Sequence, residues 1–382
     1  MAPGGFRSVA VIGVGLIGGS FAAALKRLDD APRVVGINRN PASLSYALDH
    51  GIIDEGAAPG SELANSWLSA GGVDLVVLGM PPNHVEEWLK ALGANGYDGV
   101  VTDVASTKGG VLRAVRRALP GTSRFVGGHP MAGSELSGVH AARADLFDGA
   151  YWLLTPTAET DPQAFSAMHA LVTAVGARVI SVDAAAHDEA VAIVSHVPHV
   201  AASALVDLAA AHAGERGELM RLAAGGFKDT TRIAAGSADL WTGICLDNAD
   251  AVTEGISELR DRLGVFEGML RARDADAIRT WLDQAAIVRR ALPAQWVPAT
   301  TRLTELIVPM LDRTGVVAEI TGAVSRAGCN IEGIDIDHQS ESAAVLVLVL
   351  TDEGDFSALV SDLTERGYEP ELSPLEEPGE ES

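Results

Sequence analysis

The sequence is poor in aromatic residues and in cysteine. Its 382 residues include 8 Phe, 6 Trp and 4 Tyr, so its hydrophobic cores must rest mainly on Ala, Val, Leu and Ile. Two cysteines, Cys245 and Cys329, cannot form a disulfide framework, and no C-x-x-C pair suggests a structural zinc site. This cysteine usage fits a reducing compartment, and we expect a cytoplasmic protein.

Positive charge is scarce as well. The chain has 28 Lys and Arg against 51 Asp and Glu, a formal net charge of −23. So acidic a protein is poorly suited to bind nucleic acid or an anionic membrane surface. The charge is also uneven, because 18 acids and three arginines lie between Leu303 and Ser382, which leaves a net charge of −8 for the rest. This asymmetry predicts a separate C-terminal module.

The apolar run near the N-terminus lacks the features of a signal peptide or a membrane span. The run from Val9 to Leu25 is short and rich in glycine, and its positive charges, Lys26 and Arg27, follow it. A signal peptide carries such charges before its apolar core, and a membrane span needs more length. We therefore expect a soluble protein.

The first 183 residues alternate between apolar strands and helical segments. The strands lack polar alternation, which is typical of parallel strands buried on both faces. Residues 1–183 are predicted to form a Rossmann-type α/β domain with a doubly wound parallel sheet. The expected strands are Ser8–Ile12, Arg33–Ile37, Asp74–Leu78, Gly99–Asp103, Phe125–Gly128, Tyr151–Thr155 and Arg178–Val182, with helices at Gly18–Leu28 and Pro41–His50.

Residues 184–296 have helical patterns alone and are predicted to form an all-α domain. His187–Ala213 is alanine-rich and interrupted by Pro198, and Asp247–Arg273 and Ala275–Leu292 are amphipathic. The apolar stripes of these segments are too wide for one small domain to cover, so we expect a homodimer.

A proline-containing linker, Pro293–Thr301, precedes a small α+β unit over residues 303–375. Its segments alternate as βαββα. They are Thr304–Leu311, Val316–Ala327, Asn330–His338, Ala343–Leu350 and Asp355–Arg366. The acidic tail Glu376–Ser382 is predicted to be disordered.

A glycine-rich turn, Gly13-Val14-Gly15-Leu16-Ile17-Gly18, joins the first strand to the first helix. Gly13 permits a tight turn, Gly15 allows close approach of a pyrophosphate, and Gly18 allows the helix to pack on the strand. The free N–H groups at the helix start, including those of Leu16 and Ile17, can hold the diphosphate of a nicotinamide dinucleotide.

The second strand ends in Asn38 and Arg39, where an acid normally binds the adenosine ribose of NAD. Asn38 can hydrogen-bond a ribose hydroxyl, and Arg39 can pair with a 2′-phosphate, stack on adenine or be an ordinary loop residue. NAD is the expected cofactor, and NADP stays open.

Polar clusters at the ends of apolar elements carry a resemblance to a known family. They are DVASTK at 103–108, GGHPMAGSE at 127–135, HVPH at 196–199, GFKDTTRIA at 226–234 and ADLW at 238–241. In this order they resemble the prephenate dehydrogenases of tyrosine biosynthesis, over residues 9–292. The resemblance implies oxidative decarboxylation of prephenate to 4-hydroxyphenylpyruvate with hydride transfer to NAD(P).

The resemblance also implies roles for particular residues. A base with a pKa near working pH suits the loss of the 4-hydroxyl proton, and His129 is the candidate. Ser106 would orient His129 or the hydroxyl, Arg232 would bind one carboxylate through two hydrogen bonds, and His196 and His199 would meet the other. Lys228 stands where the family more often has arginine, and Glu135 and Asp229 match acids near the substrate entrance.

These residues have plainer interpretations too. His129 could be a turn histidine, Ser106 a helix N-cap and Arg232 part of an interdomain salt bridge. His196 and His199 could satisfy buried polar groups, and no third ligand adjoins them to complete a metal site. No metal is expected.

The C-terminal unit resembles an ACT domain, a family of amino-acid-sensing modules, through LDRTG at 311–315 and Cys329-Asn330-Ile331. The resemblance places Gly315, Asn330 and Ile331 at an effector site and implies feedback inhibition by L-tyrosine, although the unit could also serve dimerisation alone. Two other functions stay open. They are an arogenate dehydrogenase and a noncatalytic amino-acid sensor, and the presence of Ser106, His129 and Arg232 argues against the sensor.

Overall fold

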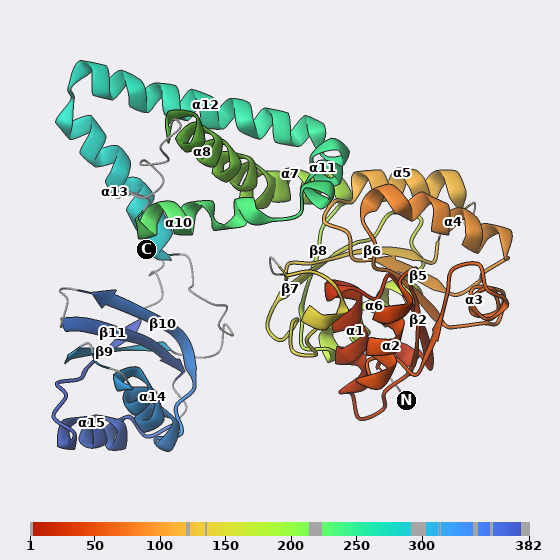
Figure 1. The fold of residues 1–382 in the computed structure, drawn as a ribbon, viewed down its shortest axis with the longest axis horizontal. Coiled ribbons are helices and arrows are strands. Elements are labelled where there is room, and N and C mark those ends of the chain that lie inside the picture. The colour runs from red at the N-terminus through yellow and green to blue at the C-terminus, as the bar shows by residue number, and fades with distance from the viewer. Residues whose placement is uncertain are drawn as a thin grey trace. The chain divides into compact units, whose positions relative to one another are not determined.

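The structure is a computed structural model that describes residues 3–119, 123–133, 136–213, 224–291, 303–311, 313, 315–338, 343–351 and 354–375. The chain divides into two compact units, Met1–Gly268 and Met269–Ser382. Figure 1 shows the α/β sheet and most of the helical region in the first unit and a smaller sheet in the second.

The described residues of the first unit form an eight-stranded sheet in the order β3-β2-β1-β4-β5-β6-β7-β8. Ile12 pairs with Ile37 and Leu78, and Leu78 with Asp103, so the carboxyl ends of β1, β2, β4 and β5 share one edge. The strands are β1 (Ser8–Ile12), β2 (Arg33–Ile37), β3 (Glu55–Ala57), β4 (Leu75–Leu78), β5 (Val100–Asp103), β6 (Phe125–Pro130), β7 (Tyr151–Thr155) and β8 (Arg178–Ser181).

The sheet is parallel from β3 to β6, but β7 runs antiparallel to β6. The expectation of an entirely parallel sheet is therefore wrong at this edge. A parallel connection needs a crossover helix. The described residues between β6 and β7 contain a short 3-10 turn, η3 (Val139–Ala141), whereas helix α6 (Pro162–Ala174) carries the chain from β7 to the parallel strand β8.

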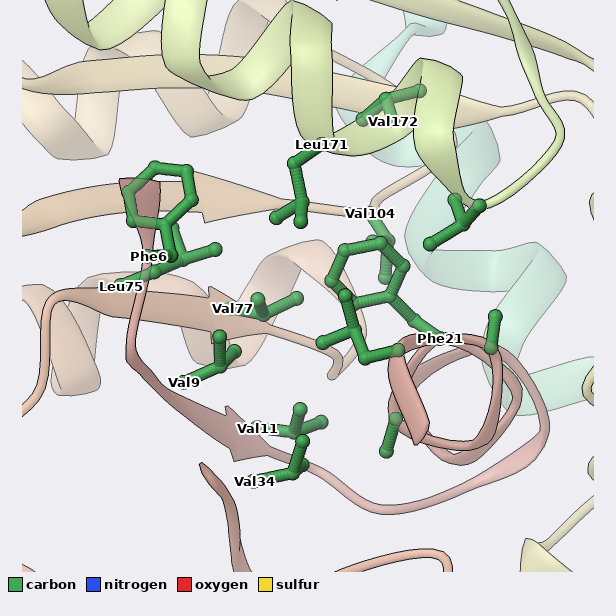
Figure 2. Close-up of a cluster of buried hydrophobic side chains, with 14 of the residues drawn as sticks. Phe6, Val9, Val11, Phe21, Val34, Leu75, Val77, Val104, Leu171 and Val172 are labelled. Carbon is green, nitrogen blue, oxygen red and sulfur yellow. The ribbon is translucent and has the colours of Figure 1, made fainter. Parts of the chain in front are cut away.

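Helices cover both faces of the sheet (Figure 1). Val9 and Val11 of β1 pack toward α1, α2 and α6, and Figure 2 shows part of this cluster around Phe21. Ala10 and Ile12 point to the other face, against α3, α4 and α5. The further elements of this region are η1 (Pro3–Gly5), α1 (Leu16–Lys26), α2 (Pro41–Asp49), α3 (Glu62–Trp67), η2 (Pro82–His84), α4 (Val85–Ala94) and α5 (Gly109–Ala118).

The core is mainly aliphatic, as predicted, and its few aromatic residues are grouped. Phe21, Phe147 and Trp152 are fully buried and contact one another at ring-centroid distances of 5.0–6.3 Å. Tilted and edge-on aromatic contacts add about 0.5–1.5 kcal/mol per pair to ordinary burial.

The helical region begins with an unbroken helical run, α7 (Ala184–Val191), the π-helical turn η4 (Ala192–His196) and α8 (Val197–Ala213). The predicted interruption at Pro198 is wrong. Proline has no N–H group and clashes with the carbonyl of the preceding turn, and the wider π turn just before it accommodates both effects. Ala184–His212 is the one described stretch that is long and apolar enough to span a membrane, although core helices of soluble proteins pass the same test.

The other helical elements that the structure describes in this region lie beyond residue 224. They are α10 (Gly225–Thr231), the 3-10 turn η5 (Arg232–Ala235), α11 (Ala238–Asp247), α12 (Ala249–Ala272) and α13 (Ala275–Ala291). The expected helix Asp247–Arg273 thus begins two residues later, because Asn248 ends α11.

The second unit contains a four-stranded antiparallel sheet in the order β10-β11-β9-β12. Its core joins Leu306 and Leu346 of the sheet to Ile320 and Leu359 of the two helices. The elements are β9 (Leu303–Leu311), α14 (Val316–Arg326), β10 (Ile331–His338), β11 (Ala343–Thr351), α15 (Phe356–Glu365) and β12 (Glu371–Leu375). The last strand is absent from the predicted βαββα order, because Pro374 weakens its pattern, and it pairs at the edge with β9 alone among the described strands.

Candidate active site

A cavity of about 290 Å³ lies at the carboxyl ends of the parallel strands. Gly13 has a φ of +94°, and a Cβ atom there would lie 2.6 Å from the oxygen of Gly79. Gly18 packs against the Gly13 carbonyl, so this turn also needs glycine. The cavity is lined by Ile12, Gly13, Gly15, Ile37, Asn38, Arg39, Pro59, Gly79, Met80, Pro81, His84, Glu87 and Trp88.

The start of α1 fits the diphosphate of a dinucleotide. Gly15 is the N-cap of α1 and provides no side-chain hydrogen bond to the helix. No described atom lies within 4 Å of where a Cβ of Gly15 would stand, so the space before the helix is open. The first N–H groups of α1, those of Leu16 and Ile17 among them, have no partner inside the helix and can bind phosphate oxygens.

Asn38 and Arg39 line the same cavity, as predicted from their place after β2. The Asn38 amide donates to the oxygen of Val14 over 3.1 Å, and its own oxygen lies 3.4 Å from the Asn40 N–H. Within the described ranges Arg39 has no ion-pair partner, and Glu87 also lines the cavity. Asn38 and Arg39 therefore stand where a ribose or its phosphate would be recognised.

His129 lies near the end of β6 and is 9% exposed. Its Nδ1 lies 2.8 Å from Nε2 of His187, and Nδ1 of His187 lies 2.8 Å from Oδ1 of Asp188. Burial, and after it the positive charge of Lys108 and the neighbouring His187 and His196, holds the pKa of His129 well below 6.5. A neutral imidazole is thus available as a base at neutral pH.

Lys108 and Asp103 form a fully buried ion pair beneath His129. The Lys108 ammonium also donates to the Gly128 oxygen over 2.6 Å, and Asp103 accepts the Gly128 N–H over 3.1 Å. Burial lowers the pKa of Lys108, and the charge and hydrogen bond of Asp103 oppose that shift. These contacts hold the end of β6, and with it His129, against β5.

Ser106 is half-buried in the turn between β5 and α5. It is not a helix N-cap, because α5 begins at Gly109 and Lys108 takes the cap position without a side-chain bond. Asp188 instead accepts the N–H groups of Lys108 and Gly109, each over 2.8 Å. Ser106 has no hydrogen bond to His129 or to any other residue that the structure describes, so its hydroxyl is available to a ligand.

His196 and His199 contact the same indole, that of Trp241, as expected for residues on one helix face. The His199 ring stacks on Trp241 with centroids 3.5 Å apart, and His196 meets it edge-on at 6.0 Å. Burial lowers the pKa of His196 to about 4 and also lowers that of His199. Nδ1 of His199 is buried and has no hydrogen-bond partner among the described residues.

The charged residues expected to bind substrate lie in the helical region. Lys228 and Asp229 lie on α10 and Arg232 begins η5, and all three side chains are exposed. The turn that follows η5 reaches His199, since a Cβ on Gly236 would stand 3.4 Å from the His199 ring. Glu135 lies outside the described residues.

The buried hydrogen-bonded cluster around His129 includes two residues that the sequence analysis missed, His187 and Asp188. They follow each other at the start of an alanine-rich helix, where paired polar residues are an available but nonspecific signal. In the described part of the chain, no group of three or more His, Cys, Asp or Glu residues could hold a metal ion.

The predicted effector residues lie at opposite ends of the small sheet in the second unit. Gly315, with φ +89°, precedes α14, whereas Asn330 and Ile331 follow that helix at the start of β10. Eleven residues separate the ends of α14, roughly 16 Å along its axis. One chain therefore does not bring Gly315 and Asn330 together.

A dinucleotide cleft and a buried histidine on the same edge of a parallel sheet are typical of a nicotinamide-dependent dehydrogenase. Comparison with known proteins narrows this class. Residues 21–181 match the family described as "Prephenate dehydrogenase, nucleotide-binding domain", residues 183–284 match "Prephenate dehydrogenase, dimerization domain", and residues 304–367 match "ACT domain".

Individual proteins give the same result. A prephenate dehydrogenase of Bacillus subtilis is 33% identical over 86% of this chain and 88% of its own, and one of Lactococcus lactis is 32% identical over 82% and 85%. A crystal structure of prephenate dehydrogenase from Aquifex aeolicus, in complex with hydroxyphenyl propionate and NAD+, covers 74% of this chain and 97% of its own with a TM-score of 0.69 and 34% identity.

The chain belongs to the prephenate dehydrogenase family and is a nucleotide-dependent oxidoreductase. The predicted family, fold class and enzyme class are confirmed.

Proposed function

We propose that this oxidoreductase converts prephenate to 4-hydroxyphenylpyruvate and carbon dioxide, with NAD as cofactor and His129 as the base. The observation that carries the proposal is the buried, neutral His129 at the end of β6, on the sheet edge where the dinucleotide cavity opens. NAD supplies the acceptor for the hydride that leaves C4 of the substrate.

Residues of this chain carry out the proton transfer and bind the substrate and the cofactor. His129 takes the proton of the 4-hydroxyl, and the unpartnered hydroxyl of Ser106 positions that group. Aromatisation of the ring drives loss of carbon dioxide, so the proposed route uses neither a covalent nucleophile nor a metal. Gly13, Gly15 and Gly18, the N–H groups at the start of α1, and Asn38 and Arg39 hold the cofactor.

Two carboxylates of prephenate need polar partners in an acidic protein. Arg232 can bind one of them through two parallel hydrogen bonds. His196 and His199, which both contact Trp241, would bind the other carboxylate. Nδ1 of His199, which is buried without a hydrogen-bond partner among the described residues, is a polar atom available to it. Asp229 and Glu135 are proposed to act at the substrate entrance and Lys228 to take the place of the family's more common arginine, although Glu135 lies outside the described residues.

Initial rates with prephenate and with arogenate, each with NAD and with NADP, test the proposed function. We expect the highest kcat/KM with prephenate and NAD, and turnover of prephenate by His129→Asn that is lower by about two to four orders of magnitude. Higher kcat/KM with arogenate would make the protein an arogenate dehydrogenase, and no turnover of either substrate by the folded wild type would overturn the enzymatic proposal.

The helical region supports a homodimer. Several of its large apolar side chains are exposed on one chain. They include Leu205, Leu208, Leu246, Leu263 and Val265. A second copy of the chain would remove them from water. The two cysteines cannot form a disulfide framework and the chain has a net charge of −23, and both features fit a protein of the reducing cytoplasm.

L-tyrosine is the proposed effector of the C-terminal unit, through Gly315, Asn330 and Ile331. Because Gly315 and Asn330 lie at opposite ends of α14, a ligand that touches both would lie between two copies of the unit. Removal of residues 303–382 separates this site from competition at the active centre. A truncated enzyme that turns over but is insensitive to tyrosine supports the proposal, and one with unchanged sensitivity refutes it.

A further inference from the structure

His129, His187 and Asp188 form a buried chain of hydrogen bonds that joins the α/β region to the helical region. His187 is fully buried, and the side chains of His129 and Asp188 are nearly so. Both hydrogen bonds, His129 Nδ1 to His187 Nε2 and His187 Nδ1 to Asp188 Oδ1, are 2.8 Å long. Such short contacts inside a protein fix the ring orientations.

We infer that His187 and Asp188 are positioning residues that hold His129 in the tautomer with its proton on Nδ1 and the lone pair of Nε2 directed to the reacting hydroxyl. This inference rests on the proposed function of His129. It assigns to two residues outside the family motifs a role in setting which nitrogen of the base is free.

The direction of each hydrogen bond follows from the fixed end of the chain. Oδ1 of Asp188 accepts the N–H of Lys108 and Oδ2 accepts the N–H of Gly109, so the group acts as an acceptor on both oxygens. Burial raises the pKa of Asp188, but the hydrogen bonds from His187, Lys108 and Gly109 outweigh it and the net shift is downward. Asp188 is therefore a carboxylate, which can only accept.

The proton positions then follow one after another. Because Asp188 accepts, Nδ1 of His187 must carry a proton, and Nε2 of neutral His187 has a lone pair. That lone pair accepts the Nδ1 proton of His129, which leaves Nε2 of His129 unprotonated. The opposite tautomer of His129 would place two lone pairs face to face in a buried site.

Other charged groups near His129 favour the same neutral form. Lys108, which is paired with Asp103, and the neighbouring His187 and His196 all oppose protonation of His129. If His187 carried a second proton, its Nε2 would donate to Nδ1 of His129. The proton of neutral His129 would then lie on Nε2, where no lone pair would remain for the substrate. The relay therefore requires neutral His187 as well as ionised Asp188.

Asp188 is itself held at several points. Its carboxylate caps the start of α5, and its backbone oxygen accepts the Asn248 amide over 2.7 Å. The Asn248 amide nitrogen also lies 3.3 Å from Nδ1 of His196. The orientation of His129 thus depends on the docking of α7 against α5, within the first unit.

Nitrogen NMR of the wild-type enzyme labelled with ¹⁵N-histidine tests the tautomer without any turnover. We expect a protonated Nδ1 and an unprotonated Nε2 on His129 at pH 7.5, assigned by the loss of its signals in His129→Asn. A protonated Nε2 in the wild type would overturn the inference, whether or not the protein proves to be a prephenate dehydrogenase.

Kinetics of Asp188→Asn test the consequence for catalysis. Asparagine places an N–H₂ group where one oxygen accepted, so kcat should fall by about 10- to 1,000-fold while the KM for prephenate changes by less than about threefold. The variant should also show partial protonation of His129 Nε2 by NMR. Unchanged kcat and an unchanged tautomer in folded Asp188→Asn would contradict the assignment.

Asp183→Asn is the matched control, because Asp183 caps α7 through the N–H groups of Ala185 and Ala186 and lies outside the relay. Asparagine caps helices as well as aspartate does, so this variant should keep wild-type kcat and tautomer. If Asp188→Asn fails to fold, His187→Gln replaces it. A folded His187→Gln with wild-type kcat and wild-type His129 signals would refute the relay.

Discussion

The cofactor cavity and the buried cluster around His129 lie on the same edge of one sheet but are built in different ways. At the start of α1 the cavity is lined by glycines, Gly13 and Gly15, which expose their backbone. The cluster around His129 is made of buried side chains, with His129 on β6, Lys108 before α5 and Asp188 on α7. A backbone site depends on local conformation, whereas a side-chain site depends on the docking of distant segments.

The largest expected effect is the loss of turnover when His129 is replaced. His129→Asn should lower turnover by about two to four orders of magnitude, the usual loss when a general base is removed, and should keep NAD binding. The pKa of His129 is held well below 6.5, so the acid limb of the wild-type kcat/KM profile should lie below that pH and vanish in the variant. Near-normal turnover by His129→Asn would remove His129 from the mechanism.

A substitution at Arg232 tests whether the helical region binds a carboxylate of the substrate. Arg232→Ala should raise the KM for prephenate, because loss of a charge-assisted bidentate contact costs on the order of 2–4 kcal/mol. NAD affinity, measured by equilibrium titration, should stay unchanged. Arg260→Ala, an exposed arginine of α12, is the control. A parallel loss of NAD affinity would instead assign Arg232 to the fold.

The buried histidines should make stability depend on pH. His196 is 1% exposed and its pKa is about 4 in the folded chain, against 6.5 when unfolded. Stability is therefore complete above pH 6.5 and is lost as the pH falls toward 4, by about 3 kcal/mol from this group. Urea unfolding between pH 7.5 and 4.5 measures the loss. His196→Gln should flatten the slope, and an equal slope would assign the loss to other groups.

The backbone site should respond to a single methyl group. Gly15 has φ −111° and open space where a Cβ would lie, so Gly15→Ala should fold normally but place its methyl group in the diphosphate space. We expect a rise of about 10- to 100-fold in the Kd for NAD and an unchanged Tm. Gly264→Ala, within α12, should leave the Kd unchanged. Unaltered NAD binding by Gly15→Ala would place the diphosphate elsewhere.

The smallest effect concerns the ribose end of the cavity. NADP should be used less well than NAD but measurably, because Asn38 lacks the charge that repels a 2′-phosphate and Arg39 supplies a cation. Asn38→Asp should lower kcat/KM with NADP by about tenfold, roughly 1.4 kcal/mol, and leave NAD within about twofold. Equal NADP efficiency in both proteins would show that Asn38 is not beside the ribose.

The same contrast explains what could be read from the sequence. Gly13 and Gly18 could be predicted because both the turn and the close approach of helix to strand are encoded within six residues. His129 could be recognised from the residues around it in the sequence. Its partners His187 and Asp188 could not be recognised, because 58 residues separate the two histidines and only folding brings them together. The run past Pro198 and the strand around Pro374 were misjudged because a π turn accommodates the first proline and an edge position the second, and neither feature is visible in the local sequence.

The spacing of Gly315 and Asn330 in the small sheet has a consequence for how an effector would be sensed. Gly315 and Asn330 lie at opposite ends of α14, so the proposed site would be complete only where two chains meet. Ligand binding and self-association are then one linked equilibrium, and each must strengthen the other. Dilution alone should weaken the response to the effector. The sensitivity of the protein to the amino acid would therefore depend on its own concentration.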